Sequence, residues 1–206
     1  MILTMLLLSF VECKSKTKQV SVKTENSVQQ AKPINSVPTN SIDVASKFCP
    51  SGFMGDGEQG NRFITYLGAS TENPYSGTTC IKIQYKPGPV MWGGFYWQNK
   101  PGNWGDKQGE NYTGENYTKV TFYAHGKNGV EVVEFKAGGI KAAGKKYNDS
   151  FESSLGKVTL EKNWKAYEIN LKNMDLSSVI GGFCWVVSAT DNPEGVTFYL
   201  DDIKYE

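Results

Sequence analysis

Short runs of β-branched and aromatic residues alternate with turn signals from residue 62 onward. Strands separated by turns at roughly 8–12-residue intervals are typical of sandwiches and barrels. Only 173–180 is compatible with a helix, of about two turns. The pattern predicts an all-β fold, a jelly-roll β-sandwich of about eight to ten antiparallel strands. The expected strands are 62–67, 78–85, 91–98, 117–126, 129–138, 157–160, 164–171, 181–188 and 196–205.

One connection between expected strands carries a specific turn signal. Lys127, Asn128 and Gly129 separate 117–126 from the next strand, and Asn-Gly is a frequent hairpin pair. We therefore expect 117–126 and 129–138 to form a hairpin within one sheet. Three residues, 161–163, also join the following two strands.

The alternation within strands predicts which side chains meet the core, because successive side chains point to opposite faces. In 91–98 one face is apolar and small, with Met91, Gly93, Phe95 and Trp97. The same division recurs in 120–125 and 131–136. If these three strands are neighbours in one sheet, the other face combines rings with hydrogen-bonding groups: Trp92, Tyr96, Gln98, Tyr123, His125, Glu134 and Lys136.

A face of this kind suits sugars. The C–H bonds of a pyranose stack on aromatic rings, and its hydroxyls meet amide, carboxylate and amine groups. Trp104 is a further candidate, because a tryptophan in a glycine-rich loop has little core to enter. The alternative is that Trp92 is core, as large aromatic residues usually are. Four other rings are assigned to the core: Phe95, Trp97, Trp164 and Trp185.

The composition narrows the class of protein. The chain has 206 residues, of which 13% are aromatic and 22 are glycine, and this mixture favours strands and turns in one domain. Its net charge of +1 argues against a dedicated nucleic-acid binder, which would carry a basic face. We expect a monomer.

The first residues form an apolar run that stops at Cys13. The run is too short to span a bilayer as a helix, which needs about 20 residues, and it fits an export signal. An apolar run ending at a cysteine before a polar segment resembles a bacterial lipoprotein precursor, in which Cys13 is lipidated. The alternative is a buried amino-terminal strand. The expected order is a leader (1–13), a flexible polar tether (14–42) and the sandwich domain (43–206).

This leader predicts an exported protein of the cell envelope or extracellular space, attached to a membrane only through Cys13. Three further cysteines are Cys49, Cys80 and Cys184, and none lies in a CxxC pair. With a single histidine in the chain, they do not indicate a zinc or iron–sulfur site. One disulfide and one buried thiol are expected, and which pair closes is left open.

Several segments between 50 and 206 share glycine-flanked aromatic strands, ending in a strand that contains Asp201 and Asp202. They are 50–57, 73–85, 93–105, 120–140, 180–188 and 196–206. These segments resemble non-catalytic carbohydrate-binding modules with a galactose-binding-like jelly roll. The resemblance implies a β-sandwich that binds a polysaccharide or other glycan. Similar modules often hold a structural calcium ion, which here implies Asp201, with Asp56 or Glu58 and carbonyls from 74–79, as ligands.

The residues themselves offer little for catalysis. His125 is the only histidine, no GxSxG surrounds a serine, and Glu131 and Glu134 fall on opposite faces of one strand. The leading hypothesis is therefore non-catalytic glycan binding. A small jelly-roll glycosidase or polysaccharide lyase using Glu134 and His125 is the first alternative. An adhesive or structural surface lipoprotein is the second.

Overall fold

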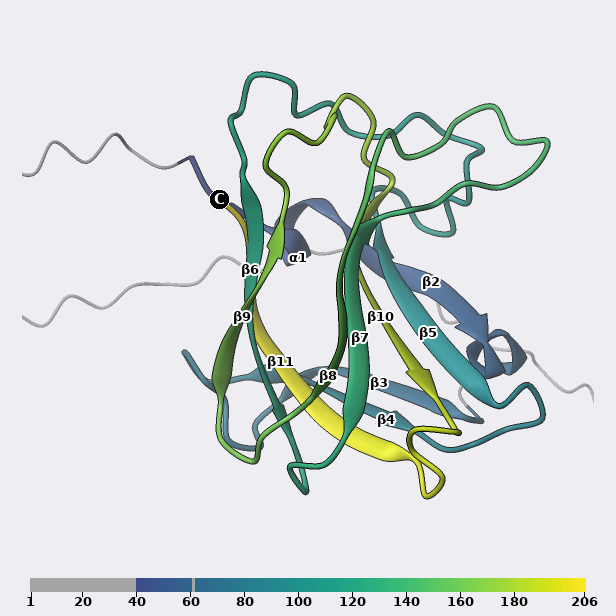
Figure 1. Cartoon of the computed structure of the whole chain (residues 1–206), viewed down its shortest axis with the longest axis vertical. Coiled ribbons are helices and arrows are strands. Elements are labelled where there is room, and N and C mark those ends of the chain that lie inside the picture. Colours follow the sequence, from purple (N-terminus) through teal and green to yellow (C-terminus); the bar gives the residue numbers. More distant parts are fainter. Residues whose placement is uncertain (1–39, 61) are drawn as a thin grey trace, which may run out of the picture. The chain divides into compact units, whose positions relative to one another are not determined.

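The structure is a computed structural model that describes residues 40–60 and 62–206, and these residues form a β-sandwich. Two antiparallel sheets face each other across one core (Figure 1). The expected all-β jelly roll is confirmed, and the described residues form eleven strands where about eight to ten were expected. The predictions for the leader, for Cys13 and for most of the tether lie outside the described residues.

The first sheet, here called sheet A, has the order β3–β4–β11–β6–β9, and β1 pairs with β11. The second, sheet B, has the order β2–β5–β10–β7–β8. The strands of sheet A are β1 (Ile42–Asp43), β3 (Ile64–Ser70), β4 (Cys80–Tyr85), β6 (Lys119–Gly126), β9 (Lys165–Asn170) and β11 (Val196–Tyr205). Those of sheet B are β2 (Cys49–Gly55), β5 (Trp92–Gln98), β7 (Val132–Gly138), β8 (Glu152–Thr159) and β10 (Gly181–Ser188).

The core lies between the sheets and is built from aromatic rings. Phe122 of sheet A packs on Phe183 of sheet B at 5.0 Å, and Trp185 packs edge-on against Phe198 at 5.4 Å. The expected core faces are confirmed, since Phe95, Trp97, Val120, Phe122, Ala124, Val133 and Phe135 are all buried. Met91 is the exception. It precedes β5, has a backbone φ of 64° and is 55% exposed.

The expected hairpin between 117–126 and 129–138 is wrong, because β6 belongs to sheet A and β7 to sheet B. Both strands have one strongly apolar face, and facing each other across the core buries both. The turn is closed by the buried Glu131, whose carboxylate accepts hydrogen bonds from the backbone N–H groups of Asn128, Gly129 and Val130. The connections β8–β9 and β10–β11 also pass from one sheet to the other.

Within the part of the chain that the structure describes, helical structure is confined to two single turns, α1 (Val44–Lys47) and η1 (Asp56–Gln59). Asp43 caps α1 by accepting from the N–H of Ala45. The helix-compatible stretch 173–180 is not helical. Its Val179 instead forms an isolated bridge with Glu110, and both backbone hydrogen bonds of that pair are made.

Two further expectations, on the cysteines and on the domain boundary, can be compared with the structure. Cys49, Cys80 and Cys184 are all buried and do not pair with one another, so the expected disulfide among them is absent. Among the described residues, the first strand begins at Ile42, one residue before the boundary expected for the domain. No helix within 40–60 or 62–206 is long and apolar enough to cross a membrane.

Candidate functional site

The predicted ring-bearing face is divided between the two sheets. Trp92, Tyr96 and Gln98 of β5 and Glu134 and Lys136 of β7 share the outer face of sheet B, with β10 between them. In the register, Cys184 of β10 lies beside both Tyr96 and Lys136. The assumption that the three strands β5, β6 and β7 are neighbours in one sheet is wrong. Because β6 belongs to sheet A, Tyr123 and His125 lie on the outer face of that sheet, on the opposite side of the sandwich.

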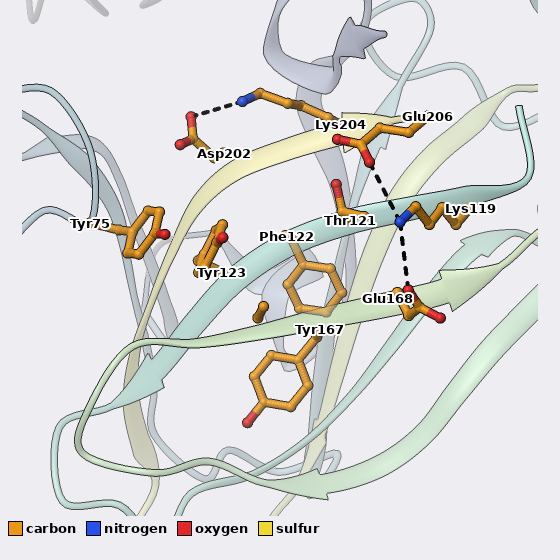
Figure 2. A pocket seen from close by; sticks show the side chains of 11 residues that line it. Tyr75, Lys119, Thr121, Phe122, Tyr123, Tyr167, Glu168, Asp202, Lys204 and Glu206 are labelled. Carbon is orange, nitrogen blue, oxygen red and sulfur yellow. Dashed lines mark ion pairs between the residues drawn. The ribbon is translucent and has the colours of Figure 1, made fainter. Parts of the chain in front are cut away.

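On sheet A, Tyr123 remains accessible and His125 does not. The ring of Tyr123 stacks on Tyr75 with centroids 3.5 Å apart, and both line a cavity (Figure 2). His125 is 6% exposed, between the stacked ring of Tyr199 at 4.5 Å and the edge-on ring of Trp164 at 4.4 Å. Trp164 is therefore half-buried on this outer face, and the expectation that it belongs to the core is wrong.

His125 is thus a packing residue and has no access to a ligand on sheet B. Its Nδ1 lies 3.1 Å from the carbonyl oxygen of Gly126. Burial lowers its pKa below the usual value, although the carbonyl of Gly126 and the charge of Glu131 oppose this. Because Glu134 lies on the other sheet, the alternative of an enzyme using Glu134 and His125 in one groove is wrong.

Trp92 opens β5 and is 37% exposed on the outer face of sheet B. Its ring lies over Gly55, the last residue of β2. A Cβ at Gly55 would come within 2.9 Å of Trp92 Cδ2 and 2.5 Å of the Trp92 carbonyl oxygen. Gly55 also has φ 60° and ψ −127°, a conformation that residues with a Cβ rarely adopt. Gly55 therefore allows both the backbone turn after β2 and the position of the Trp92 ring directly over it.

The loop before Trp92 is held by Asp56, whose side chain is fully buried. Its carboxylate accepts hydrogen bonds from the Tyr85 hydroxyl at 2.9 Å and from the N–H groups of Gly88 at 2.9 Å and Val90 at 2.8 Å. These donors direct hydrogens at the oxygens that a metal ion would need. Asp56 therefore fixes the 86–90 loop and does not fit a calcium site.

The other proposed calcium ligands do not join it. Asp201 accepts hydrogen bonds from the N–H groups of Tyr75 and Ser76. It lies near the first residues of β4, whereas Asp56 contacts Tyr85 at the last residue of the same strand. The two carboxylates are therefore at opposite ends of β4. Glu58 is exposed in η1. Among residues 40–60 and 62–206, no three acidic, histidine or cysteine side chains gather as a metal-binding group. The predicted ligand set is wrong, and calcium binding by other groups stays a prediction.

Tyr96 and Gln98 point to the outer face of sheet B as expected, but loops cover them. Tyr96 is 6% exposed and donates its hydroxyl hydrogen to the carbonyl of Gly138 at 3.0 Å; burial raises its pKa. Gln98 has no exposed surface. Its oxygen accepts from Ser51 at 2.8 Å and its amide donates to the carbonyl of Asn103 at 2.9 Å. The expectation of a solvent-facing Tyr96 and Gln98 is wrong.

The covering loop presents Trp104. This half-buried ring meets Tyr96 edge-on, with centroids 6.0 Å apart. Its neighbour Asn103 fixes the loop, because the side-chain oxygen accepts from the N–H groups of Gly105 at 3.1 Å and Lys107 at 2.9 Å. Its amide donates to Asn99 at 2.9 Å. Asn103 was missed in the sequence, where it reads as one more turn residue.

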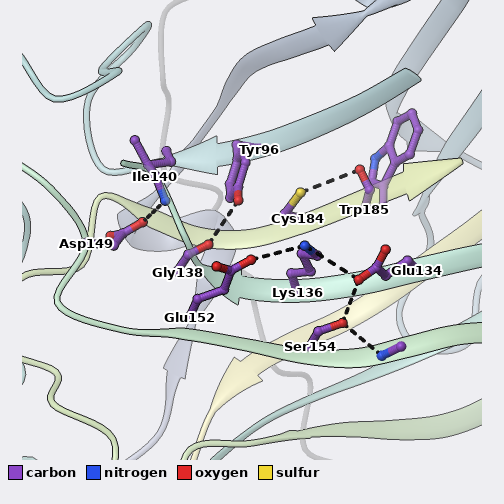
Figure 3. Close-up of polar contacts among 11 residues, drawn as sticks. Tyr96, Glu134, Lys136, Gly138, Ile140, Asp149, Glu152, Ser154, Cys184 and Trp185 are labelled. Atoms are coloured by element: carbon purple, nitrogen blue, oxygen red, sulfur yellow. Dashed lines mark hydrogen bonds and ion pairs between the residues drawn. The ribbon is translucent and has the colours of Figure 1, made fainter. Parts of the chain in front are cut away.

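A second buried side chain missed in the sequence holds the other covering loop. Asp149 accepts hydrogen bonds from the N–H groups of Ile140, Ile180 and Gly181. Figure 3 shows the bond from Ile140. Burial raises its pKa to about 6, although the three N–H donors favour the charged form. These bonds tie the 138–149 loop to the start of β10, beside Tyr96.

A row of charged groups lies beside these rings on sheet B (Figure 3). Lys136 Nζ is 3.1 Å from Glu152 Oε1 and 3.5 Å from Glu134 Oε1, and the Ser154 hydroxyl donates to Glu134 at 2.8 Å. Burial lowers the pKa of Lys136, but the hydrogen bond to Glu152 and both carboxylates raise it more, so it stays charged. The row offers one donor group between two acceptors.

Together these residues form a surface that we call the Trp92–Trp104 face. Trp92 and Trp104 lie toward its two ends, and Met54, Gly94 and Val186 lie between. Trp92 and Tyr96, four residues apart on one strand, are separated by about 13 Å along it. A Cβ at Gly94 would lie 2.7 Å from Met54 Cε, so the Met54 side chain lies directly over Gly94 and forms the surface there. The charged row runs along one side, formed by Glu134, Lys136, Glu152 and Ser154.

Comparison with known proteins supports the fold. No protein-family model and no curated protein sequence matches the chain. Among solved structures, a family 30 carbohydrate-binding module has 16% identity and a TM-score of 0.53, covering 81% of this chain and 98% of that one. A second crystal structure of a family 30 module has 18% identity and a TM-score of 0.53, with 80% and 86% covered.

The family 30 module of a cellulosomal cellulase from Clostridium thermocellum has 17% identity and a TM-score of 0.53, with 81% and 96% covered. These modules span nearly the whole described part of the chain. At this level of identity the likeness concerns architecture. The chain therefore has the jelly-roll β-sandwich fold found in carbohydrate-binding modules.

Proposed function

We propose that this chain is a non-catalytic polysaccharide-binding protein and that the Trp92–Trp104 face holds the glycan. The observation that carries the proposal is the exposed ring of Trp92 on the same face as Trp104 and the charged row. A sugar chain lying along β5 would stack on rings at two points. Its hydroxyls would meet Glu134, Lys136 and Glu152.

The side chains of this face are preorganised, which supports binding of a glycan without its hydrolysis. Asp56 and Gly55 hold Trp92, and Asn103 holds the Trp104 loop, so little conformational entropy is lost when a ligand stacks. The charged groups beside the rings are already paired with one another, as suits hydrogen bonding to hydroxyls. A general acid would instead need a carboxyl group kept protonated. The family 30 modules that share this fold are carbohydrate-binding modules, which agrees with this function.

The direct test is affinity electrophoresis of the full chain in gels containing mixed-linkage β-glucan, glucomannan, xylan or xyloglucan. We expect retardation by at least one polymer and no release of reducing sugar. Trp92→Ala should weaken binding about tenfold or more. Leu67→Ala is the matched control, because Leu67 is an apolar side chain, 49% exposed, on the other sheet.

The outcomes separate the functions considered. Sugar release would establish an enzyme. Absence of retardation by every polymer would overturn glycan binding and favour an adhesive role for the exposed apolar tip formed by Val90, Met91 and Trp92. Equal retardation of wild type and Trp92→Ala would place the glycan elsewhere.

We further propose that the protein is exported and anchored by lipid at Cys13. The support is the apolar run that ends at Cys13 and the lysine-rich polar segment after it. Metabolic labelling with a fatty-acid analogue tests this. We expect label in the wild type and none in Cys13→Ser, which should also leave the membrane fraction. Equal labelling of the two proteins would contradict lipidation at Cys13.

A further inference from the structure

A cavity of about 680 Å³ opens on the outer face of sheet A (Figure 2). It lies over β6, β9 and β11, on the side of the sandwich opposite to the Trp92–Trp104 face. Its volume falls within the range of about 300–1,000 Å³ that is common for small-molecule sites. One end is aromatic and the remainder is lined by side chains of both charges.

The aromatic end is a stacked pair of tyrosines. The rings of Tyr75 and Tyr123 are 3.5 Å apart and inclined by 16°, and Trp164 meets Tyr75 edge-on at 6.0 Å. Tyr75 is 44% exposed on the outer face of sheet A, whereas the large rings on the inner face of that sheet are nearly all buried. The stack therefore offers an accessible ring at the mouth of the cavity.

The loop that carries Tyr75 is held at two points. Asp201 accepts hydrogen bonds from the N–H groups of Tyr75 and Ser76, both at 3.1 Å. The indole N–H of Trp164 donates to the carbonyl of Asn73 at 2.8 Å. An exposed ring on a pinned loop loses little freedom on binding, as a stacking surface requires.

The polar lining supplies donors and acceptors in alternation. Lys119 Nζ lies 3.8 Å from Glu168 and 3.7 Å from Glu206, and Lys204 Nζ lies 3.5 Å from Asp202 (Figure 2). These separations exceed the 2.7–3.2 Å of a direct hydrogen bond. A ligand hydroxyl that approaches such a pair from the side can therefore accept from the lysine and donate to the carboxylate.

This lining selects a class of ligand. Three carboxylates, Glu168, Asp202 and Glu206, would repel a phosphate or nucleic acid, and two lysines would oppose a polycation. A neutral molecule rich in hydroxyls, with a face of C–H bonds to stack on Tyr75, satisfies all of these groups. We propose that the cavity is a second glycan-binding site. This inference rests on the proposed function, and it makes the protein bivalent for one polysaccharide.

Bivalency has a physical consequence. Because the two sites face away from each other, one short chain cannot reach both. The protein would therefore join separate glycan chains, and its retention on a polymer surface would exceed the affinity of either site.

Isothermal titration of the full chain with cellohexaose, mannohexaose and xylohexaose tests the proposal. We expect two sites per chain for a bound hexasaccharide. Tyr75→Ala and Trp92→Ala should each reduce the number to one, with at least a tenfold loss at the altered site. Tyr75→Phe keeps the ring and should keep two sites. Leu67→Ala, on the same outer face but outside the cavity lining, is the control for surface changes.

The outcomes distinguish this inference from the proposed function. One site in the wild type, lost in Trp92→Ala and unchanged in Tyr75→Ala, would overturn the second site and leave the function intact. One site that depends only on Tyr75 would support the cavity and overturn the Trp92–Trp104 face. No binding of any hexasaccharide would overturn both. Thermal melting of Tyr75→Ala near that of wild type confirms that a lost site does not reflect unfolding.

Cross-linking gives an independent readout. Mixing the wild-type protein with soluble mixed-linkage β-glucan should raise light scattering when the number of glycan-binding sites is close to the number of polysaccharide molecules. Tyr75→Ala should bind the polymer through the other face without raising the scattering. Equal scattering by the two proteins would contradict bivalency through this cavity.

Discussion

The carboxylate of Asp201 in β11 accepts a hydrogen bond from the backbone N–H of Tyr75, 3.1 Å away and 126 positions earlier in the chain. The same oxygen accepts from Ser76. An acidic residue that resembles a calcium ligand in sequence thus helps to hold a loop, together with the hydrogen bond from Trp164 to Asn73. It also helps to set the position of Tyr75, the more exposed ring of the stacked pair.

Replacing Asp201 should release this loop. Asp201→Asn replaces part of the carboxylate with an amide that donates, so the N–H groups of Tyr75 and Ser76 lose acceptor capacity. We expect a loss of about 1–3 kcal/mol in the free energy of unfolding, measured in urea. Asp106→Asn is the control, since Asp106 forms an exposed ion pair with Lys145 worth less than about 1 kcal/mol. Equal losses in the two variants would contradict the role of Asp201.

Calcium provides a separate test of the same residue. Because N–H donors surround the Asp201 carboxylate, we expect the difference in Tm between calcium and chelator to be the same in wild-type protein and Asp201→Asn. Differential scanning fluorimetry measures both. A calcium-dependent rise in Tm that disappears in Asp201→Asn would show that this carboxylate binds the ion after all.

Gly55 should be required for the position of Trp92. A Cβ in Gly55→Ala would meet the Trp92 carbonyl oxygen and ring and would strain a backbone with φ 60°. We expect a loss of about 2–4 kcal/mol in unfolding free energy, and weaker glycan binding because the ring moves. Gly102→Ala separates strain from contact, since Gly102 also has a positive φ but nothing within 4 Å. It should cost about 1 kcal/mol and leave binding unchanged. Unchanged glycan binding in Gly55→Ala would contradict the requirement of Gly55 for the position of the Trp92 ring.

His125 should make stability depend on pH. Burial holds its pKa below the value of about 6.5 expected in the unfolded chain. Above that value both states are neutral and His125 contributes nothing. As the pH falls below it, the unfolded chain binds the proton first, so the folded state loses stability until the lowered pKa is reached. His125→Phe keeps a ring against Tyr199 and Trp164 and removes this loss.

The measurement is the unfolding free energy of both proteins between about pH 7.5 and about pH 5. Asp149, whose pKa is raised to about 6, acts in the opposite direction, because its contribution is lost as the pH rises through that value. It does so in both proteins, so the difference between the two curves isolates His125. Parallel curves would show that His125 is not the group responsible.

The alternation of side chains was enough to find the strands and their inner faces. Phe95, Trp97, Val133 and Phe135 are buried as their positions in the pattern require. This information is local, because neighbouring residues of a strand always point to opposite sides. Trp104 was also recognised as a candidate, because a tryptophan in a glycine-rich loop has little core to enter.

The order of the strands was not available from that pattern. β5, β6 and β7 each have one apolar face, and the same pattern is compatible with any arrangement that buries all three. The chain places β6 opposite β7, so that Phe122 meets Phe135 across the core at 4.7 Å. That choice separates Tyr123 from Trp92 and creates two surfaces in place of one.

The pattern of the sequence also could not show which loops cover the outer face of a sheet. Tyr96 and Gln98 point outward in the strand, as the sequence indicates, but the loops fixed by Asn103 and Asp149 bury them. The sequence by itself therefore determined the strands, their inner faces and the residue types suited to a sugar. Tertiary structure alone decided which of those residues meet, because sheet order and loop position depend on contacts between segments far apart in the chain. The donors around Asp56 and Asp201 come from such distant segments, and they decide that these carboxylates hold loops rather than a metal ion.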